Sequence, residues 1–227
     1  MVRMDEIKDL MRDARGNKVL FASHCLLNMN ARYLGGACLP DMRTDLLQYA
    51  HERNIALVQM PCPEQHAWGG LLKPLMWSVL GSENTLLYKL RVITLPAFRL
   101  YTQWRFSSTA RSVARQIADC LRAGCQVVGV VGVDGSPSCG VSCRIDLKRA
   151  FALYARTQLA ALDRDRLNHC LYTDCLGPGA GLYLQVLTSR LKRAGMQVPI
   201  HAISLMDEMI SHGDAAAMQP IEWEDMP

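Results

Sequence analysis

The sequence predicts an α/β fold with a Rossmann-like, three-layer arrangement: a parallel sheet with helices on both of its faces. The first observation is that short apolar segments alternate along the chain with longer amphipathic segments, which is the pattern of repeated βαβ units. The second is that the apolar segments are almost continuously hydrophobic, as in strands buried on both faces. The 227 residues suit one large domain, so we expect a single domain over residues 1–227.

The expected strands are short and end in Cys, Pro or Gly-rich segments. They are residues 18–25 (KVLFASHC), 55–62 (IALVQMPC), 125–134 (CQVVGVVGVD) and 198–205 (VPIHAISL), with a shorter candidate at 169–175. Each is an apolar run of the length typical of a buried strand.

The expected helices lie between these strands, at residues 42–54, 108–124, 144–166 and 177–195. In the second of them, Val113, Ile117 and Leu121 recur at helical spacing, and Gly124 follows as a C-cap. The last begins in a glycine-rich segment (GPGAG) that predicts a tight turn or, less specifically, an anion site at a helix N-terminus.

Composition excludes several classes of function. The net charge of +4 is too small to predict nucleic-acid binding. No apolar run approaches the roughly 18 residues of a membrane span, and residues 1–20 are charged and lack an apolar signal core. We therefore expect a cytoplasmic protein. Its nine cysteines then indicate metal ligation, a reactive thiol or core packing rather than disulfides.

Residues 66–107 interrupt the alternating pattern and hold seven of the fifteen aromatic residues. We interpret this segment as an insertion, either a lid over a site or a surface for a homodimer. An extension of the core is an equally valid interpretation.

Three cysteines fall at or just after the carboxyl end of a predicted strand: Cys25, Cys62 and Cys139. Because the carboxyl ends of parallel strands share one sheet edge, these thiols are expected to meet in one crevice. Structural zinc normally takes four ligands and catalytic zinc three, whereas a cubane iron–sulfur cluster normally takes four cysteines. Three thiolates would leave one iron open to a soft ligand such as sulfur. Burial as small apolar residues remains the alternative.

The segments around these cysteines, SHCLLNMNARYLGG, PCPE with WGGL downstream, and GSPSCG, resemble the 2-thiouracil desulfidase family. The resemblance spans roughly residues 18–143 and, more weakly, GPGAGLYLQVL. It implies a [4Fe–4S] cluster held by Cys25, Cys62 and Cys139, with an open iron that takes sulfur from a thiolated substrate. It also implies catalytic roles for Glu64 and Ser136. The family's common NCRYDGG appears here as NARYLGG. Ala31 replaces a cysteine that is not one of the three implied ligands, whereas Leu34 replaces an aspartate, and that loss puts a thiouracil-like substrate in doubt.

Other residues of these segments are candidates for contact with substrate. They are His24, Asn28, Arg32 and Ser138, with Tyr33 as a further residue of the family pattern. A structural histidine and Asx turns are the alternatives for the first two. Cys38, Cys143 and Cys175 could lie near the pocket, but core packing is the expectation for Cys143 and open for the other two.

These observations predict an enzyme that removes sulfur hydrolytically from a small thiolated molecule, with Glu64 as general acid or base. A non-catalytic zinc or iron–sulfur module that senses redox state or a partner is the main alternative. A metal-free thiol enzyme with Cys139 as nucleophile is the third.

Overall fold

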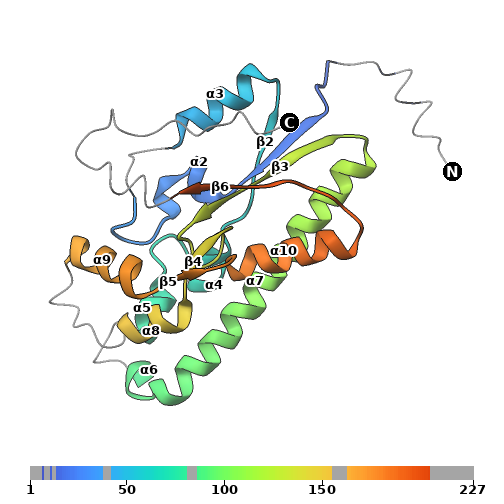
Figure 1. Ribbon diagram of the computed structural model, residues 1–227. Coiled ribbons are helices and arrows are strands. Elements are labelled where there is room, and N and C mark those ends of the chain that lie inside the picture. Colours follow the sequence, from blue (N-terminus) through green and yellow to red (C-terminus); the bar gives the residue numbers. More distant parts are fainter. Residues whose placement is uncertain are drawn as a thin grey trace.

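The computed structural model describes residues 14–37, 42–80, 86–154 and 163–204, together with Ile7 and Met11. The elements are, in chain order, β1 (Lys18–Ala22), α2 (His24–Leu27), the 3-10 helix η1 (Met29–Ala31), α3 (Thr44–Glu52), β2 (Ala56–Gln59), α4 (Pro63–Trp68), α5 (Pro74–Leu80), α6 (Leu86–Lys89), α7 (Arg91–Arg122), β3 (Gln126–Asp134), β4 (Cys143–Ile145), α8 (Leu147–Tyr154), α9 (Arg164–Asp174), β5 (Leu176–Pro178), α10 (Leu182–Arg193) and β6 (Ile200–Ser204). Figure 1 shows their arrangement, with α7 running the length of the molecule.

Four strands form one sheet in the order β2-β1-β3-β6, and every neighbouring pair is parallel. β1 shows how both faces are buried. Val19 and Phe21 pack into an apolar cluster with α4, α7 and α10, whereas Leu20 and Ala22 pack into a second cluster with α3. Successive side chains of a strand point to opposite faces, so the molecule has three layers. The predicted Rossmann-like α/β fold is confirmed.

The strand order reverses between β1 and β3. The chain passes from β1 to β2 on one side, through α3, and then returns through α7 to β3 on the other side of β1. Crevices at such a reversal, outside the carboxyl ends of the strands, are the usual ligand sites of open α/β sheets. Topology thus places a pocket beside the segments that follow β1 and β3.

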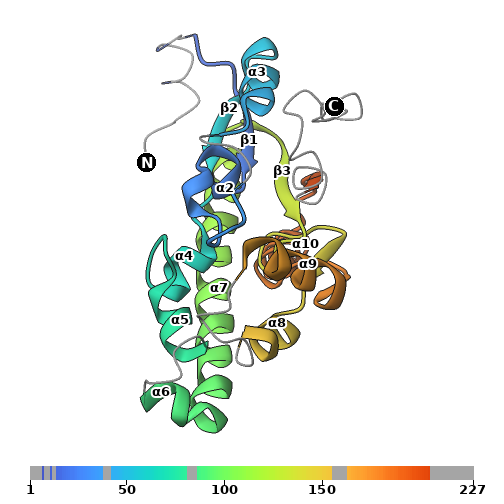
Figure 2. The ribbon, with the colours of Figure 1, turned by 90° about the vertical axis from the view of Figure 1, so that its left-hand side faces the viewer.

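Most of the described residues of the segment 66–107 are helical, and residues 81–85 lie outside the described ranges. They span the end of α4, α5, α6 and the first half of α7, and Figure 2 shows the three short helices following one another along α7. Trp68 and Phe106 are buried with ring centroids 5.8 Å apart, and Phe151 of α8 packs against Trp68. Part of the segment therefore belongs to the core.

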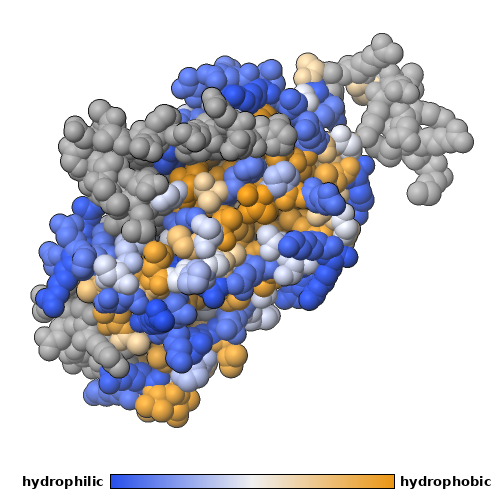
Figure 3. Space-filling model, in the orientation of Figure 1, coloured by the Kyte–Doolittle hydropathy of each residue, from blue (hydrophilic) through white to orange (hydrophobic). Residues whose placement is uncertain are grey.

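Other side chains of this segment face solvent. Trp104 is 56% exposed, and Leu86, Val92 and Ile93 form an apolar surface where α6 meets α7 (Figure 3). The homodimer expected from these residues stays a prediction. None of the described helices is long and apolar enough to cross a membrane.

The expectation of one helix over 144–166 is wrong at its start, where β4 lies, and that of a strand over 169–175 is wrong throughout, because α9 runs to Asp174 and β5 begins only at Leu176. β4 and β5 pair antiparallel, and residues 155–162 lie outside the described ranges. α9 begins where the Asp163 side chain accepts a hydrogen bond from the Arg166 amide at 2.8 Å. Leu167 and Leu171, one helical turn apart, are its buried face. The expected element began at residue 169 and so left out Leu167, which is why the helical spacing of Leu167 and Leu171 was missed.

Phe106→Ala is expected to lower the free energy of unfolding by about 3–5 kcal/mol, because it opens a cavity beside Trp68. Trp104→Ala, two residues earlier on the same helix and largely exposed, is the matched control, with a loss under about 1 kcal/mol. Urea unfolding measures both. Equal losses would show that Phe106 is not part of the core.

Candidate functional site

A pocket lies at the carboxyl ends of the central strands, with about 500 Å³ of space that includes its opening to solvent. The residues that line it come from all three sequence segments: His24, Cys25, Ala31, Arg32, Tyr33, Cys62, Pro63, Glu64, Val133, Gly135, Ser136, Pro137, Ser138 and Cys139. Every predicted site residue except Asn28 is among them. The Asn28 side chain instead accepts a hydrogen bond from the Asn30 amide at 3.1 Å and begins η1.

The three predicted cysteines reach the pocket from three elements. Cys25 lies in α2 directly after β1, Cys62 is the N-cap of α4 after β2, and Cys139 lies in the loop after β3. The Cys62 sulfur accepts a hydrogen bond from the Gln65 amide at 3.4 Å. Cys25 was expected to end a strand, but β1 stops at Ala22 and His24–Leu27 is a helical turn.

Burial favours the neutral form of two of these thiols, those of Cys62 and Cys139. Burial raises the pKa of Cys62 to about 12, and the Glu64 carboxylate adds to the shift. Burial also raises the pKa of Cys139 well above its usual value, with further contributions from Cys25 and Cys62. The three sulfurs therefore lie close enough to influence one another. A bound metal centre would reverse the shifts, because a coordinating thiol is deprotonated by the positive charge it meets.

The loop after β3 is folded tightly by its own polar groups. The Asp134 carboxylate accepts hydrogen bonds from the amides of Val141 and Ser142 at 2.7 and 2.9 Å and from the Ser142 hydroxyl. The Ser136 hydroxyl oxygen accepts one from the Cys139 amide at 3.1 Å. These bonds, together with Pro137, hold Cys139 at the pocket.

The N-terminus of α10 closes this loop from behind. The amides of Gly181, Leu182 and Leu184 donate to the carbonyl oxygens of Gly140, Pro137 and Ser138, at distances of 2.9, 3.3 and 3.2 Å. These donors are thus used inside the protein, which favours the tight-turn interpretation of GPGAG over an anion site.

A chain of polar side chains runs along the wall of the pocket. The Ser138 hydroxyl donates to Glu64 Oε1 at 2.8 Å, and the Ser136 and Ser138 hydroxyl oxygens are 3.1 Å apart. Lys73 Nζ lies 3.1 Å from Glu64 Oε2. The sequence predicted the glutamate and both serines as site residues. It did not point to Lys73, which stands in an apolar stretch with no recognisable spacing.

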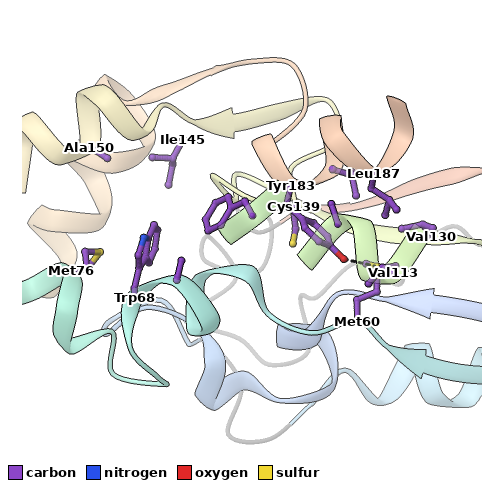
Figure 4. Close-up of a cluster of buried hydrophobic side chains, with 14 of the residues drawn as sticks. Met60, Trp68, Met76, Val113, Val130, Cys139, Ile145, Ala150, Tyr183 and Leu187 are labelled. Carbon is purple, nitrogen blue, oxygen red and sulfur yellow. Dashed lines mark hydrogen bonds between the residues drawn. The ribbon is translucent and has the colours of Figure 1, made fainter. Parts of the chain in front are cut away.

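Tyr183 is a second residue that sequence analysis missed. It is fully buried on α10 beside Cys139, and its hydroxyl donates to the Met60 sulfur at 3.5 Å (Figure 4). Burial, followed by the charges of Cys139 and Cys62, raises the pKa of its phenol. In the sequence, Tyr183 stands in LYL after a glycine-rich turn, and that context indicates a helix but no role at the site.

The remaining wall of the pocket comes from the first segment. His24 is partly buried, and burial and then His66 lower its pKa. The Arg32 guanidinium is buried and donates to the Gly36 carbonyl oxygen at 3.4 Å. The Tyr33 hydroxyl donates to Asn168 Oδ1 of α9 at 2.8 Å, so α9 holds this wall in place.

The other cysteines that the structure describes are not in the pocket lining. Cys143 is partly buried in β4, and Cys175 is buried in the core cluster after α9. Cys120 and Cys125 pack against the core, as expected. Cys38 lies outside the described residues.

Comparison with known proteins adds no family to this description. The chain matches no protein-family model, no curated protein and no solved structure. The likeness to 2-thiouracil desulfidases therefore rests on the three cysteine segments and, more weakly, on GPGAGLYLQVL.

Among the described residues, no three His, Cys, Asp or Glu side chains are placed to hold one metal ion between them. A single zinc ion needs its donors about 2.0–2.3 Å from one point. The ligands of a cubane bind different iron atoms and surround a larger group.

Gly181→Ala is expected to destabilise the protein by about 1–3 kcal/mol and to disturb the Cys139 loop. A Cβ at this position would lie 2.3 Å from the Ser138 carbonyl oxygen and 2.9 Å from the Cys139 nitrogen. Gly177→Ala is the control, since its Cβ would meet nothing within 4 Å. Urea unfolding measures stability, and the rate of Cys139 alkylation measures the loop. If the two variants behave alike, the close packing of α10 on the loop is wrong.

Proposed function

We propose that this protein is a [4Fe–4S]-dependent desulfidase that removes sulfur from a small thiolated molecule by hydrolysis. The observation that carries the proposal is the pocket itself. Three cysteines that are far apart in the sequence line it together with a hydrogen-bonded glutamate and serine pair. A thiocarbonyl or related C–S group is the substrate class that this chemistry fits.

Cys25, Cys62 and Cys139 would hold the cluster. Three ligands leave one iron of a cubane without a cysteine, since four is the usual number. When bound, such a cluster supplies a Lewis-acidic iron that accepts the substrate's sulfur and withdraws electrons from its carbon. In the overall reaction water provides the oxygen that replaces sulfur on carbon, and sulfide leaves, so the cluster need not change its redox state.

Glu64 is the general base in this proposal. Its Oε1 accepts the Ser138 hydroxyl, which in turn contacts the Ser136 hydroxyl. Both serines and the glutamate line the pocket, so a water molecule held at Ser136 could lose its proton to the carboxylate through the two hydroxyls as it attacks carbon. Ser138, expected from the sequence to bind substrate, then acts between Ser136 and Glu64.

His24, Arg32 and Tyr33 line the pocket beside the cysteines and are the proposed substrate contacts. Ala31, where the desulfidases commonly have a cysteine, also lines it, whereas Leu34 is 52% exposed and is not in the lining. A substrate in this pocket therefore meets a smaller, apolar residue at position 31, which supports a thiolated compound other than thiouracil.

Two observations favour this reaction over its alternatives. A module that only senses redox state has no use for a buried glutamate joined to two serines at the pocket wall. A metal-free thiol enzyme needs a nucleophile whose pKa is lowered, whereas burial raises the pKa of Cys139.

Cys25→Ser, Cys62→Ser and Cys139→Ser are each expected to reduce the iron and sulfide content to background after anaerobic reconstitution, because an alkoxyl oxygen is a poor substitute for thiolate on iron. Cys143→Ser, outside the pocket, is the control and should keep the cluster. A wild-type protein that stays colourless and retains zinc would overturn the proposal. Loss of the cluster in Cys143→Ser would show that four cysteines, not three, are needed to hold it.

Glu64→Gln should keep its iron and sulfide and lower kcat by roughly 10²–10⁴-fold, since it removes the base. The measurement is release of sulfide and of the oxo product from a panel of thiocarbonyl compounds. Glu52→Gln, at an exposed glutamate of α3, should leave the rate unchanged. Full activity in Glu64→Gln would exclude Glu64 as the base.

A further inference from the structure

Lys73 is a buried cation behind the lining of the proposed active site, where it contacts the lining residues Glu64 and Ala31. Its side chain is 1% exposed, while that of its partner Glu64 is 11% exposed. Nζ lies 3.1 Å from Glu64 Oε2 and donates to the Ala31 carbonyl oxygen at 3.3 Å. It also lies 6.0 Å from the centre of the Trp68 ring, within range of a cation–π interaction. Glu64 and Ala31 both line the pocket, and Lys73 links these two residues without lining the pocket itself.

The chain reaches this arrangement through an uncommon backbone. Gly69 and Gly70 have φ values of 87° and 116°, and Lys73 itself has φ of 53°. The Gly70 amide donates to the Gln65 carbonyl oxygen, which folds the turn back against α4. Left-handed backbone is unfavourable for a residue with a Cβ, and burial of an ammonium group is costly unless it is paired. Lys73 thus combines an unfavourable backbone conformation with a buried charge, next to the proposed active site.

We infer that Lys73 is a positioning residue for the Glu64 carboxylate. The Lys73 ammonium pairs with Glu64 Oε2, so Oε1 is the carboxylate oxygen that accepts the hydrogen bond from the Ser138 hydroxyl. The route of a proton from the pocket to Glu64 then passes through the two serines. The pairing of Lys73 with Glu64 is tested independently of the reaction, whereas its effect on rate rests on the proposed desulfidase function.

A purely structural ion pair would behave differently from a positioning pair. Buried pairs can often be replaced by apolar groups at little cost to stability, but removal of one partner leaves the other unpaired. Loss of a purely structural lysine would reduce the fraction of folded protein, and it would lower activity by the same factor in the wild type and in the Glu64→Gln variant. A positioning lysine changes kcat only through Glu64.

The first arm of the experiment measures thermal unfolding of the protein without cluster, for wild type, Lys73→Met, Glu64→Gln and the double variant. We expect Lys73→Met to lower Tm by about 5–10 °C, because it leaves the carboxylate buried and unpaired. The double variant should melt above Lys73→Met. Simple addition of the two single shifts would overturn the pairing.

The second arm measures turnover and iron content after reconstitution. Lys73→Met should lower kcat by about 10–100-fold with KM changed less than about threefold and iron content unchanged. Lys73→Arg keeps the charge and should recover part of the rate even if Lys73→Met folds poorly. In the Glu64→Gln background, Lys73→Met should have no further effect on kcat. Lys192→Met, at an exposed lysine of α10, is the control.

The outcomes separate the two proposals. An equal fall in kcat with and without Glu64 would overturn the positioning role while leaving the desulfidase function in place. If the reconstituted wild type acts on no thio-compound, the desulfidase function fails, and the unfolding experiment still decides whether Lys73 holds Glu64.

Discussion

All four strands of the main sheet run in the same direction, and the strand order reverses between β1 and β3. Each segment that leaves a strand at the carboxyl edge therefore emerges near the others, although β1 and β3 are more than a hundred residues apart. Cys25, Cys62 and Cys139 depend on this single constraint for their meeting. An antiparallel partner at any of these positions would send one cysteine to the opposite edge.

Directing three segments to one edge does not orient their side chains. The loop after β3 is oriented by two further contacts: Asp134 binds its amides from one side, and the amides at the start of α10 bind its carbonyl groups from the other. Backbone atoms approach so closely at Gly140 and Gly181 that an added Cβ would lie 2.2 and 2.3 Å from its neighbours. A loop satisfied in this way has little freedom, as a preorganised site requires.

The pocket combines buried thiols with a buried ion pair. In the protein alone the thiols of Cys62 and Cys139 favour the neutral form, because burial raises their pKa. Thiolates become favourable only next to positive charge, and Lys73 is already engaged by Glu64. The proposed cluster would supply that positive charge. The same electrostatics provides no support for Cys139 as a free nucleophile.

Local patterns were sufficient for the fold class, the main strands and the three pocket cysteines, because apolar runs and helical spacing are properties of neighbouring residues. They failed at β4 and β5, whose three residues each are held by pairing with a distant strand. They also failed at Cys25, which was expected in a strand but lies in α2. The Ser23 hydroxyl donates to the Val131 carbonyl oxygen, and α2 begins at the next residue. Asn28 was recognisable as a polar residue of the right segment, but only the fold turned its side chain into a cap.

Lys73 marks the boundary between the two kinds of information. No pattern in GGLLKP predicts that its lysine is buried, because burial depends on what the turn after α4 packs against. Its partners are Ala31, 42 residues earlier, and Glu64 on the preceding helix. The residues that could belong to the site were evident from composition and order along the chain. Which of them touch was decided by long-range packing, since a hydrogen bond depends on positions in space that no local pattern specifies.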